Sequence, residues 1–197
     1  MNSIFNKEHV YASITAFYAV SVSEFHMNPH MHDSCEIMYV TGGCCTVRCQ
    51  GEEFKLCQNQ FIFIDAGVPH ELLISDGQPC GVLNLEFQCK KEASAIALSL
   101  LFQNSSQVRE FCGRKIPFAV SEDLRNLGYA LKDLIACLQK NDSREDYLLS
   151  LLFQRMLLEL ADSVNQHRKS SGLYYLKKAC AYIEDNLCEP LKVPEIA

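Results

Sequence analysis

EIMYVT at residues 36–41 is the first of six short runs that are rich in β-branched and aromatic residues. The other five are CTVRC (45–49), EEFKL (52–56), QFIFID (60–65), HELLI (70–74) and VLNLEF (82–87). Turn-forming pairs such as Gly42-Gly43 and Asp76-Gly77 separate them. Short strands at intervals of about 8 to 12 residues, with no helical period between them, indicate an antiparallel β-sandwich or barrel. The preceding segment, VYASITAFYAVSVSEF (10–25), predicts one or two further strands.

The sequence period changes to that of helices after about residue 92. Leucines at positions 124, 127, 131, 134 and 138 recur at steps of three and four behind Ser121-Glu122-Asp123, which supplies an N-cap and acidic residues for the first turn. A second helix is predicted after Asp142-Ser143, where Asp142 and Glu145 have the spacing of a capping box. Its apolar stripe contains Leu148, Leu149, Leu151, Leu152, Met156, Leu157 and Leu160. The chain is therefore predicted to be mainly β with C-terminal helices.

A polar segment, HRKSSG (167–172), interrupts the helical pattern and predicts a linker. Beyond it, Leu176, Ala179, Ile183 and Leu187 mark one face of a third helix. The last residues, LKVPEIA (191–197), have the character of the start of a fourth helix, because proline is accepted in the first turn.

The composition is that of a packed soluble domain, since 48% of the 197 residues are apolar and 21% are charged. No apolar run approaches the roughly 20 residues of a membrane span. The N-terminus, MNSIFNKEHVYASI, lacks the features of a secretory signal. We therefore expect a cytoplasmic protein without membrane contact. Its eleven cysteines never form a C-x-x-C pair, and they are expected to be reduced and mostly buried.

The formal net charge of -6 lies entirely in the first half of the chain. Residues 1–90 contain 4 Lys and Arg against 10 Asp and Glu, whereas residues 91–197 contain 14 of each kind. Surfaces that contact a nucleic-acid backbone carry clustered Lys and Arg. The first half is therefore excluded as a nucleic-acid-binding surface.

The residues best suited to chemistry are His30, His32, Glu36 and His70. On an extended strand, positions 30, 32 and 36 share one face, and His70 would join them from another strand. Three imidazoles and one carboxylate suit Zn, Mn, Fe or Ni and leave room for water or a substrate. The alternative is that the histidines only line a pocket and hydrogen-bond a ligand.

The alternation of side chains along a strand identifies further residues of the same interior. The parity that directs the acidic ligand inward also directs Met38 inward, and Leu72 follows in the same way from the histidine of its strand. Asn84 and Glu86 alternate with apolar residues, so they face either this cavity or solvent. A mostly apolar cavity with a few polar groups is typical of small-molecule sites. These four residues are therefore the candidate ligand-binding residues.

Two motifs carry a resemblance to a known fold family. The pattern H-x-H-x3-E-x6-G, from His30 to Gly43, resembles the first cupin motif, and G-x-x-H, from Gly67 to His70, resembles the core of the second. Cupins are small antiparallel β-barrels, and their metal-binding members hold an ion on three such histidines and one glutamate. The resemblance thus implies a divalent metal, Zn, Mn, Fe or Ni, inside the barrel.

The order of segments resembles that of transcription regulators of the AraC/XylS family, which have a single cupin barrel, a helical segment and a DNA-binding domain. LKKACAYIEDNLCEPLKVPEIA (176–197) resembles the opening of that last domain. The resemblance implies a ligand-sensing barrel at residues 1–105, a helical linker and dimerisation segment at 106–170, and the start of a helix-turn-helix domain at 171–197. It further implies a small-molecule effector such as a sugar, a homodimer, and DNA contact only through the C-terminal domain.

The leucine-rich helices are the candidate dimerisation surface. The stripe that begins near residue 148 is wider than one neighbouring element would cover, so a second copy of the chain is expected to cover the remainder. Packing of the same leucines against the barrel is the alternative. The residues assigned to dimerisation are Leu131, Leu134, Leu138, Leu148 and Leu152.

Two functions from different classes fit these observations. The first is the effector-sensing and dimerisation part of a DNA-binding regulator, which has no catalytic residues. The second is a metal-dependent cupin enzyme, such as a dioxygenase or an isomerase. The segment 173–197 favours the regulator, because an enzyme has no need for it.

Overall fold

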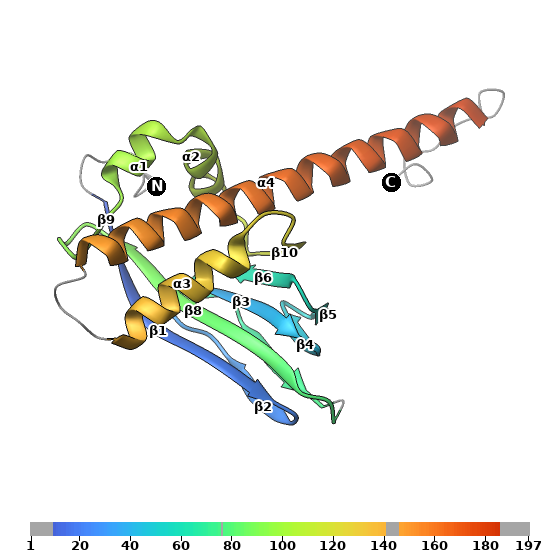
Figure 1. The fold of residues 1–197 in the computed structure, drawn as a ribbon. Helices are drawn as coiled ribbons and strands as arrows, with labels where there is room; N and C mark the ends of the chain where they lie inside the picture. Colours follow the sequence, from blue (N-terminus) through green and yellow to red (C-terminus); the bar gives the residue numbers. More distant parts are fainter. Residues whose placement is uncertain (1–9, 76, 141–145, 186–197) are drawn as a thin grey trace. The chain divides into compact units, whose positions relative to one another are not determined.

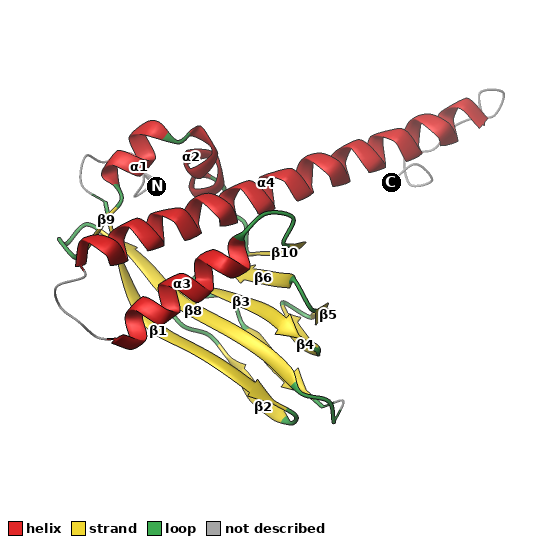
Figure 2. Cartoon of the chain, in the orientation of Figure 1, coloured by secondary structure: helices red, strands yellow, loops and turns green. Residues whose placement is uncertain are grey.

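Two antiparallel sheets enclose an apolar interior in the N-terminal part of the chain (Figure 1, Figure 2). The computed structural model describes residues 10–75, 77–140 and 146–185, with side chains as far as Gln166. It divides the chain into one compact unit that ends at Val164 and a second that begins at Asn165. Both sheets and the candidate site belong to the first unit.

The larger sheet has six strands among the described residues, in the order β10-β6-β3-β8-β1-β9. They are β1 (Tyr11–Val22), β3 (Cys35–Gly42), β6 (Gln60–Ile64), β8 (Cys80–Lys90), β9 (Ile96–Ala97) and β10 (Phe118–Glu122). The smaller sheet has the order β2-β7-β4-β5, with β2 (Phe25–His30), β4 (Cys44–Cys49), β5 (Glu52–Cys57) and β7 (His70–Ile74). The six predicted runs correspond to β3 to β8, and the segment 10–25 supplies β1 and the start of β2. The predicted fold class is confirmed, although β9 and β10 were not predicted.

The inner core lies between the two sheets. It contains Met38, Val40 and Ile62 from the larger sheet and Val47, Leu56 and Leu72 from the smaller one, and each of these side chains is at most 1% exposed. Successive residues of a strand point to opposite faces, so the inner core uses every second residue of each strand. The inward direction predicted for Met38 and Leu72 is thus confirmed.

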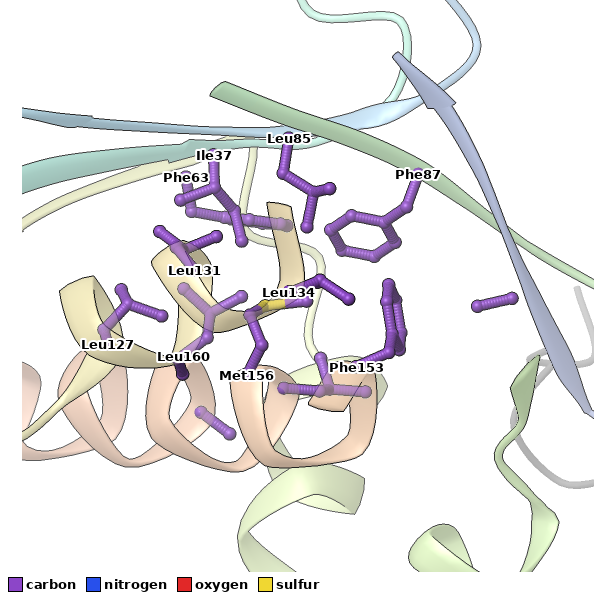
Figure 3. Close-up of a cluster of buried hydrophobic side chains, with 14 of the residues drawn as sticks. Ile37, Phe63, Leu85, Phe87, Leu127, Leu131, Leu134, Phe153, Met156 and Leu160 are labelled. Atoms are coloured by element: carbon purple, nitrogen blue, oxygen red, sulfur yellow. The ribbon is translucent and has the colours of Figure 1, made fainter. Parts of the chain in front are cut away.

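The outer core lies on the opposite face of the larger sheet, under the helices (Figure 3). Ile37, Phe63, Leu85 and Phe87 of the sheet contact the apolar faces of α3 (Leu127–Lys140) and of the first part of α4 (Asp146–Asp185). The ring centroids of Phe87 and Phe153 are 5.3 Å apart. Two short helices, α1 (Ser99–Asn104) and α2 (Ser106–Gly113), add Leu101, Phe102, Val108 and Phe111.

The start of α3 differs from the prediction. Ser121 and Glu122 belong to β10, where they pair with β6, so they do not begin the helix. The capping residue is Asp123, whose carboxylate accepts hydrogen bonds from the backbone N–H groups of Leu127 at 3.1 Å and Gly128 at 2.8 Å. The same carboxylate accepts a hydrogen bond of 3.0 Å from the hydroxyl of Tyr39 on β3. One aspartate therefore connects the larger sheet to the first turn of α3.

The five leucines predicted to form the dimerisation surface differ in their burial. Leu131 and Leu134 are 0% exposed inside the outer core, so they have no surface left for a partner. Leu138 and Leu152 are half-buried against the same core, and Leu148 is 43% exposed. Periodicity alone does not distinguish a helix face that meets a sheet from one that meets a second chain, which is why the prediction included the two buried leucines. In the part of α4 whose side chains are described, up to Gln166, the exposed large apolar residues are Tyr147, Leu148, Leu151 and Leu158.

The helix α4 includes residues 167–172, where the sequence predicted a linker. Serine and glycine lower helix propensity by about 1 kcal/mol or less per residue, and without a proline this cost does not end a helix. The pair Asp142 and Glu145, together with Leu187 and LKVPEIA, lies outside the described residues. Among the residues that are described, no helix is both long enough and apolar enough to cross a membrane.

Most cysteines whose side chains are described are free, as expected, but Cys44 and Cys57 form a disulfide. These two residues are direct partners in the β4–β5 ladder, so the pairing of the strands brings their sulfur atoms together. Strand alternation directs the next residue, Cys45, into the inner core. Burial raises the pKa of Cys45 to about 12 and that of Cys49 to about 11, which keeps both thiols protonated.

Gly128 provides a test of the contact between α3 and the larger sheet. A Cβ atom at this position would lie 2.5 Å from atoms of the buried Tyr39 ring. Alanine normally stabilises a helix by about 1 kcal/mol relative to glycine. We predict that Gly128→Ala instead lowers the free energy of unfolding by about 1 to 3 kcal/mol, because the ring cannot move without breaking its hydrogen bond to Asp123. Urea unfolding followed by circular dichroism measures the change.

Gly113 is the matched control. It lies in α2, and a Cβ atom there would meet nothing within 4 Å. Gly113→Ala should leave the free energy of unfolding unchanged or raise it by up to about 1 kcal/mol. Equal stability of the two variants would contradict the packing of α3 against Tyr39.

Candidate metal centre

The four predicted metal ligands meet at one end of the barrel. Their ligand atoms all lie within 4.8 Å of one another. One oxygen of the Glu36 carboxylate is 2.7 Å from Nε2 of His70 and 3.3 Å from Nε2 of His32. The ring centroids of His30 and His70 are 4.3 Å apart. The structure thus brings together all four residues that spacing and parity predicted.

The local structure that places His32 at the centre differs from the prediction. Strand β2 ends at His30, which is the ladder partner of His70 at the start of β7. His32 lies beyond the strand, in the connection to β3, so strand parity does not direct its side chain. Its backbone carbonyl accepts a hydrogen bond of 2.8 Å from the N–H of Gly67. This bond holds the connection against the segment that precedes His70.

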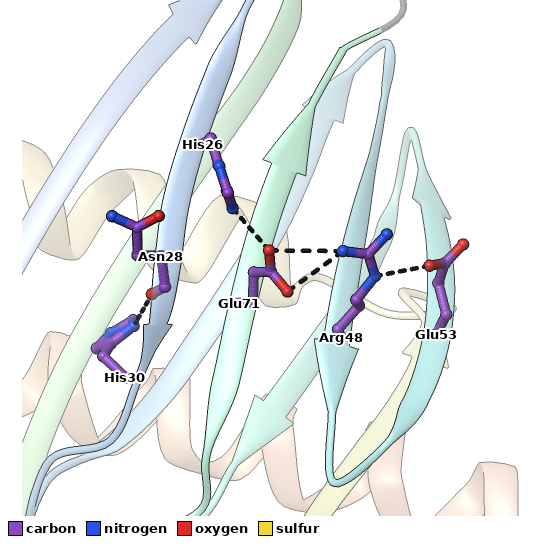
Figure 4. A network of polar contacts seen from close by, with 6 residues as sticks. All are labelled: His26, Asn28, His30, Arg48, Glu53 and Glu71. Atoms are coloured by element: carbon purple, nitrogen blue, oxygen red, sulfur yellow. Dashed lines mark hydrogen bonds and ion pairs between the residues drawn. The ribbon is translucent and has the colours of Figure 1, made fainter.

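Backbone carbonyl groups fix the orientation of all three imidazole rings. Nδ1 of His30 is 3.0 Å from the carbonyl oxygen of Asn28, Nδ1 of His32 is 2.9 Å from that of Ser34, and Nδ1 of His70 is 2.8 Å from that of Val68. Figure 4 shows the first of these bonds. A carbonyl oxygen only accepts, so each Nδ1 carries the proton and donates it. In the neutral form of each ring, Nε2 then has the lone pair that a metal ligand requires.

The charge and burial of the centre fit a divalent cation. Glu36 is 1% exposed, and burial of an unpaired carboxylate is costly. Nε2 of His70 is also buried, and a carboxylate oxygen of Glu36 lies 2.7 Å from it. Burial lowers the pKa of His70, but the Glu36 carboxylate and the Val68 carbonyl oxygen raise it, and the net direction is upward. The site therefore attracts positive charge.

His30, His32, Glu36 and His70 are the residues that would hold the ion. Nitrogen and carboxylate donors in this number suit Zn, Mn, Fe or Ni and leave coordination positions for a ligand. A bound ion would act as a Lewis acid toward an oxygen atom of that ligand. The site is accessible from one side, because His32 is 22% and Glu86 is 20% exposed at the side chain.

The candidate ligand-binding residues Asn84 and Glu86 both face the barrel interior. Asn84 is the ladder partner of Met38, and Glu86 is the ladder partner of Glu36, so each pair shares a face of the sheet. A carboxylate oxygen of Glu86 lies 3.7 Å from Nε2 of His32. The alternative that these two residues face solvent is thereby excluded.

Tyr18 is a further interior residue that the sequence did not identify. It is the ladder partner of Asn84 on β1 and packs against the inner core. The β1 ladder has an irregularity between Ile14 and Ala16, so the direction of the later side chains does not follow from counting along the run. The hydroxyl of Tyr18 and both polar atoms of the Asn84 amide are buried, and no described residue forms a hydrogen bond with them. Each such group costs about 1 to 3 kcal/mol of stability.

The opposite face of the smaller sheet carries a separate polar network (Figure 4). Glu71, which follows His70 on β7, lies 2.6 Å from Nε2 of His26 and 3.3 Å from a guanidinium nitrogen of Arg48. Arg48 also donates to Glu53 at 2.8 Å. These contacts join β2, β7, β4 and β5 on the outside of the barrel and do not contribute ligands to the centre.

Comparison with known proteins identifies the family. The family model described as the AraC-like ligand binding domain matches residues 15–176. No protein in a search of curated proteins matches the chain.

Solved structures similar to the chain include a cupin-2 domain containing protein from Shewanella frigidimarina, with 23% identity, a TM-score of 0.33 and coverage of 36% of this chain and 69% of that one. The 7S globulin of Momordica charantia has 16% identity, a TM-score of 0.32 and coverage of 40% and 27%. AerE from Microcystis aeruginosa has 18% identity, a TM-score of 0.34 and coverage of 42% and 43%, so the chain spans less than half of the last two proteins. Since the family model covers most of the sequence, the chain belongs to the AraC-like ligand binding domain family.

Proposed function

We propose that this chain is the sensor part of an AraC-type transcription regulator, which binds a small molecule inside the barrel and transmits the binding event to its helices. The match to a ligand-binding domain family supports small-molecule sensing. The regulator acts in the cytoplasm as a homodimer, and it contacts DNA only through a C-terminal helix-turn-helix domain, of which residues 171–197 resemble the start.

One observation carries this proposal: β3 has the metal centre on one face and the helices on the other. Glu36 and Met38 face the interior, whereas Ile37 and Tyr39 belong to the outer core. A ligand that shifts Glu36 or Met38 also shifts Tyr39, because the backbone of β3 carries all of them. Tyr39 donates to Asp123, which caps α3. A change in the barrel thus reaches the start of a helix through two hydrogen bonds.

The metal ion is part of the proposed effector site. It would bind an oxygen-containing group of the effector, and Glu36 would neutralise part of its charge. The effector is a small molecule, and a sugar is the class that the family resemblance implies.

The first prediction concerns metal content. We expect His70→Ala to weaken binding of Mn or Zn by about 100-fold or more, because one of four ligands is lost. Elemental analysis after loading and dialysis measures the bound ion. His26→Ala is the matched control, since His26 lies on the outer face and should leave the metal content unchanged. Equal metal content in the two variants, or none in the wild type, would show that these residues do not hold an ion.

The second prediction concerns assembly. Leu151 is 45% exposed on α4 and lies between the exposed residues Leu148 and Leu158. Leu151→Glu should weaken self-association by about tenfold or more, because burial of a charge opposes the interface. Light scattering at several concentrations measures the oligomer, and circular dichroism checks the fold.

Leu124→Glu is the control for assembly. Leu124 is 67% exposed and lies before α3, outside α4. This variant should associate like the wild type. A wild type that is monomeric at tens of micromolar would refute the dimer.

The second candidate function is a metal-dependent enzyme. Four protein ligands would leave coordination positions on a bound ion for a substrate, and metal-dependent enzymes use such positions for activation. We propose binding without turnover, so native mass spectrometry should find a retained molecule that the metal-loaded protein leaves unchanged. Conversion of that molecule to a product would establish the enzyme.

A further inference from the structure

Two neighbouring side chains in the middle of the barrel leave three buried polar atoms without partners in the described part of the chain. They are the hydroxyl of Tyr18 and the nitrogen and oxygen of the Asn84 amide. Asn84 is 0% exposed. Tyr18, Asn84 and Met38 are consecutive partners across β1, β8 and β3, and Met38 faces the inner core. All three side chains therefore point into the barrel.

This pair lies one step further into the barrel than the metal centre. Asn84 is two residues from Glu86 along β8, which corresponds to about 7 Å on an extended strand. Burial raises the pKa of Tyr18, and the carboxylates of Glu36 and Glu86 raise it further, in agreement with their proximity. His30, His32 and Glu86 are partly exposed at this end, whereas Asn84 is fully buried. The metal centre therefore lies nearer to the exposed end than Asn84 does.

We propose that Tyr18 and Asn84 form a recognition subsite for a neutral hydroxyl or carboxamide group on the molecule bound by the metal centre. The inference rests on the proposed function, because it specifies the chemistry of the same effector. It adds a second point of contact that does not involve the metal ion.

The donors and acceptors of the subsite select this chemistry. The amide of Asn84 needs an acceptor for its nitrogen and a donor for its oxygen, and the hydroxyl of Tyr18 can serve as either. A carboxylate offers acceptors only, and an ammonium group offers donors only, so each would leave one amide atom unpaired. A hydroxyl or a carboxamide offers both.

The charges around the subsite disfavour an anion. Glu36 and Glu86 face the same interior as Asn84, and no Lys or Arg is among the buried residues of the described part of the chain. A bound divalent ion offsets these two carboxylates without producing an excess of positive charge at the amide. The preferred group is therefore neutral.

The experiment uses three probes of similar size on the metal-loaded chain: glycerol, malonamide and malonate. Glycerol offers hydroxyls, malonamide offers carboxamides, and malonate offers carboxylates that bind metal ions. The side-chain amide signal of Asn84 in the NMR spectrum, assigned by its loss in Asn84→Leu, reports contact with the subsite. We expect glycerol or malonamide to shift this signal and malonate to leave it unchanged.

Asn84→Leu replaces the amide with an apolar group of similar size. We expect it to weaken binding of the neutral probe by about tenfold or more, because the subsite's hydrogen bonds are lost. Its melting temperature without probe should equal or exceed that of the wild type, since the variant removes an unpaired polar group from the interior. Tyr18→Phe should also weaken binding of the neutral probe. Tyr147→Phe, at an exposed position of α4, should leave that binding unchanged.

The outcomes separate this inference from the proposed function. A lower melting temperature for Asn84→Leu with unchanged probe binding would mean that the amide is structural, satisfied for example by a buried water, and would overturn the inference alone. Preferential binding of malonate, insensitive to both variants, would likewise overturn the inference and retain a metal-centred effector site. Failure of all three probes to perturb either Asn84 or the three histidine signals would overturn both.

Discussion

Burial of β3 on both faces is the constraint on which the rest of the structure depends. Glu36 and Met38 occupy the inner face, and Ile37 and Tyr39 occupy the outer face. Because side chains alternate with a period of two, a shift of one residue in register would exchange the two sets. It would move the acidic ligand out of the metal centre and the tyrosine away from Asp123. One register therefore fixes both the site and the attachment of α3.

The strands of the barrel could be predicted because their alternation and turn residues are local signals. Gln50, Asn59 and the glycines at 43, 51 and 67 all have positive φ, as the turn residues between the predicted strands suggested. The strand at residues 118–122 could not be predicted, because Ser121, Glu122 and Asp123 are typical of the start of a helix. Pairing with β6, which is distant in the sequence, stabilises the strand there. The leucines of α3 were equally ambiguous, since a helix stripe does not identify what covers it. Long-range contacts decide both cases.

The cluster of four candidate metal ligands could be predicted from residue type and spacing, whereas the residues around it could not. His30, His32, Glu36 and His70 form a recognisable pattern even though His32 lies outside any strand. The sequence did not decide whether Asn84 and Glu86 face the cavity or the solvent, because the alternation of side chains defines two faces of a strand without identifying the inner one. The ladder with β3 resolves this choice. The inward direction of the Tyr18 side chain is known only from its pairing with Asn84 on β8. Counting residues along the sequence does not predict it, because the ladder of β1 is irregular between Ile14 and Ala16.

The three histidines are held by carbonyl groups of their own neighbours in sequence, at Asn28, Ser34 and Val68. Every amino acid has such a carbonyl, so these positions can change identity without altering the ring orientation. The tautomer of each histidine is then set when the chain folds, before any ion arrives, and little rotational freedom remains to be lost on binding. Substitutions at Asn28, Ser34 or Val68 should therefore leave the arrangement of the four candidate ligands intact. Substitution of one of the four candidate ligands, in contrast, would remove a donor atom from the site.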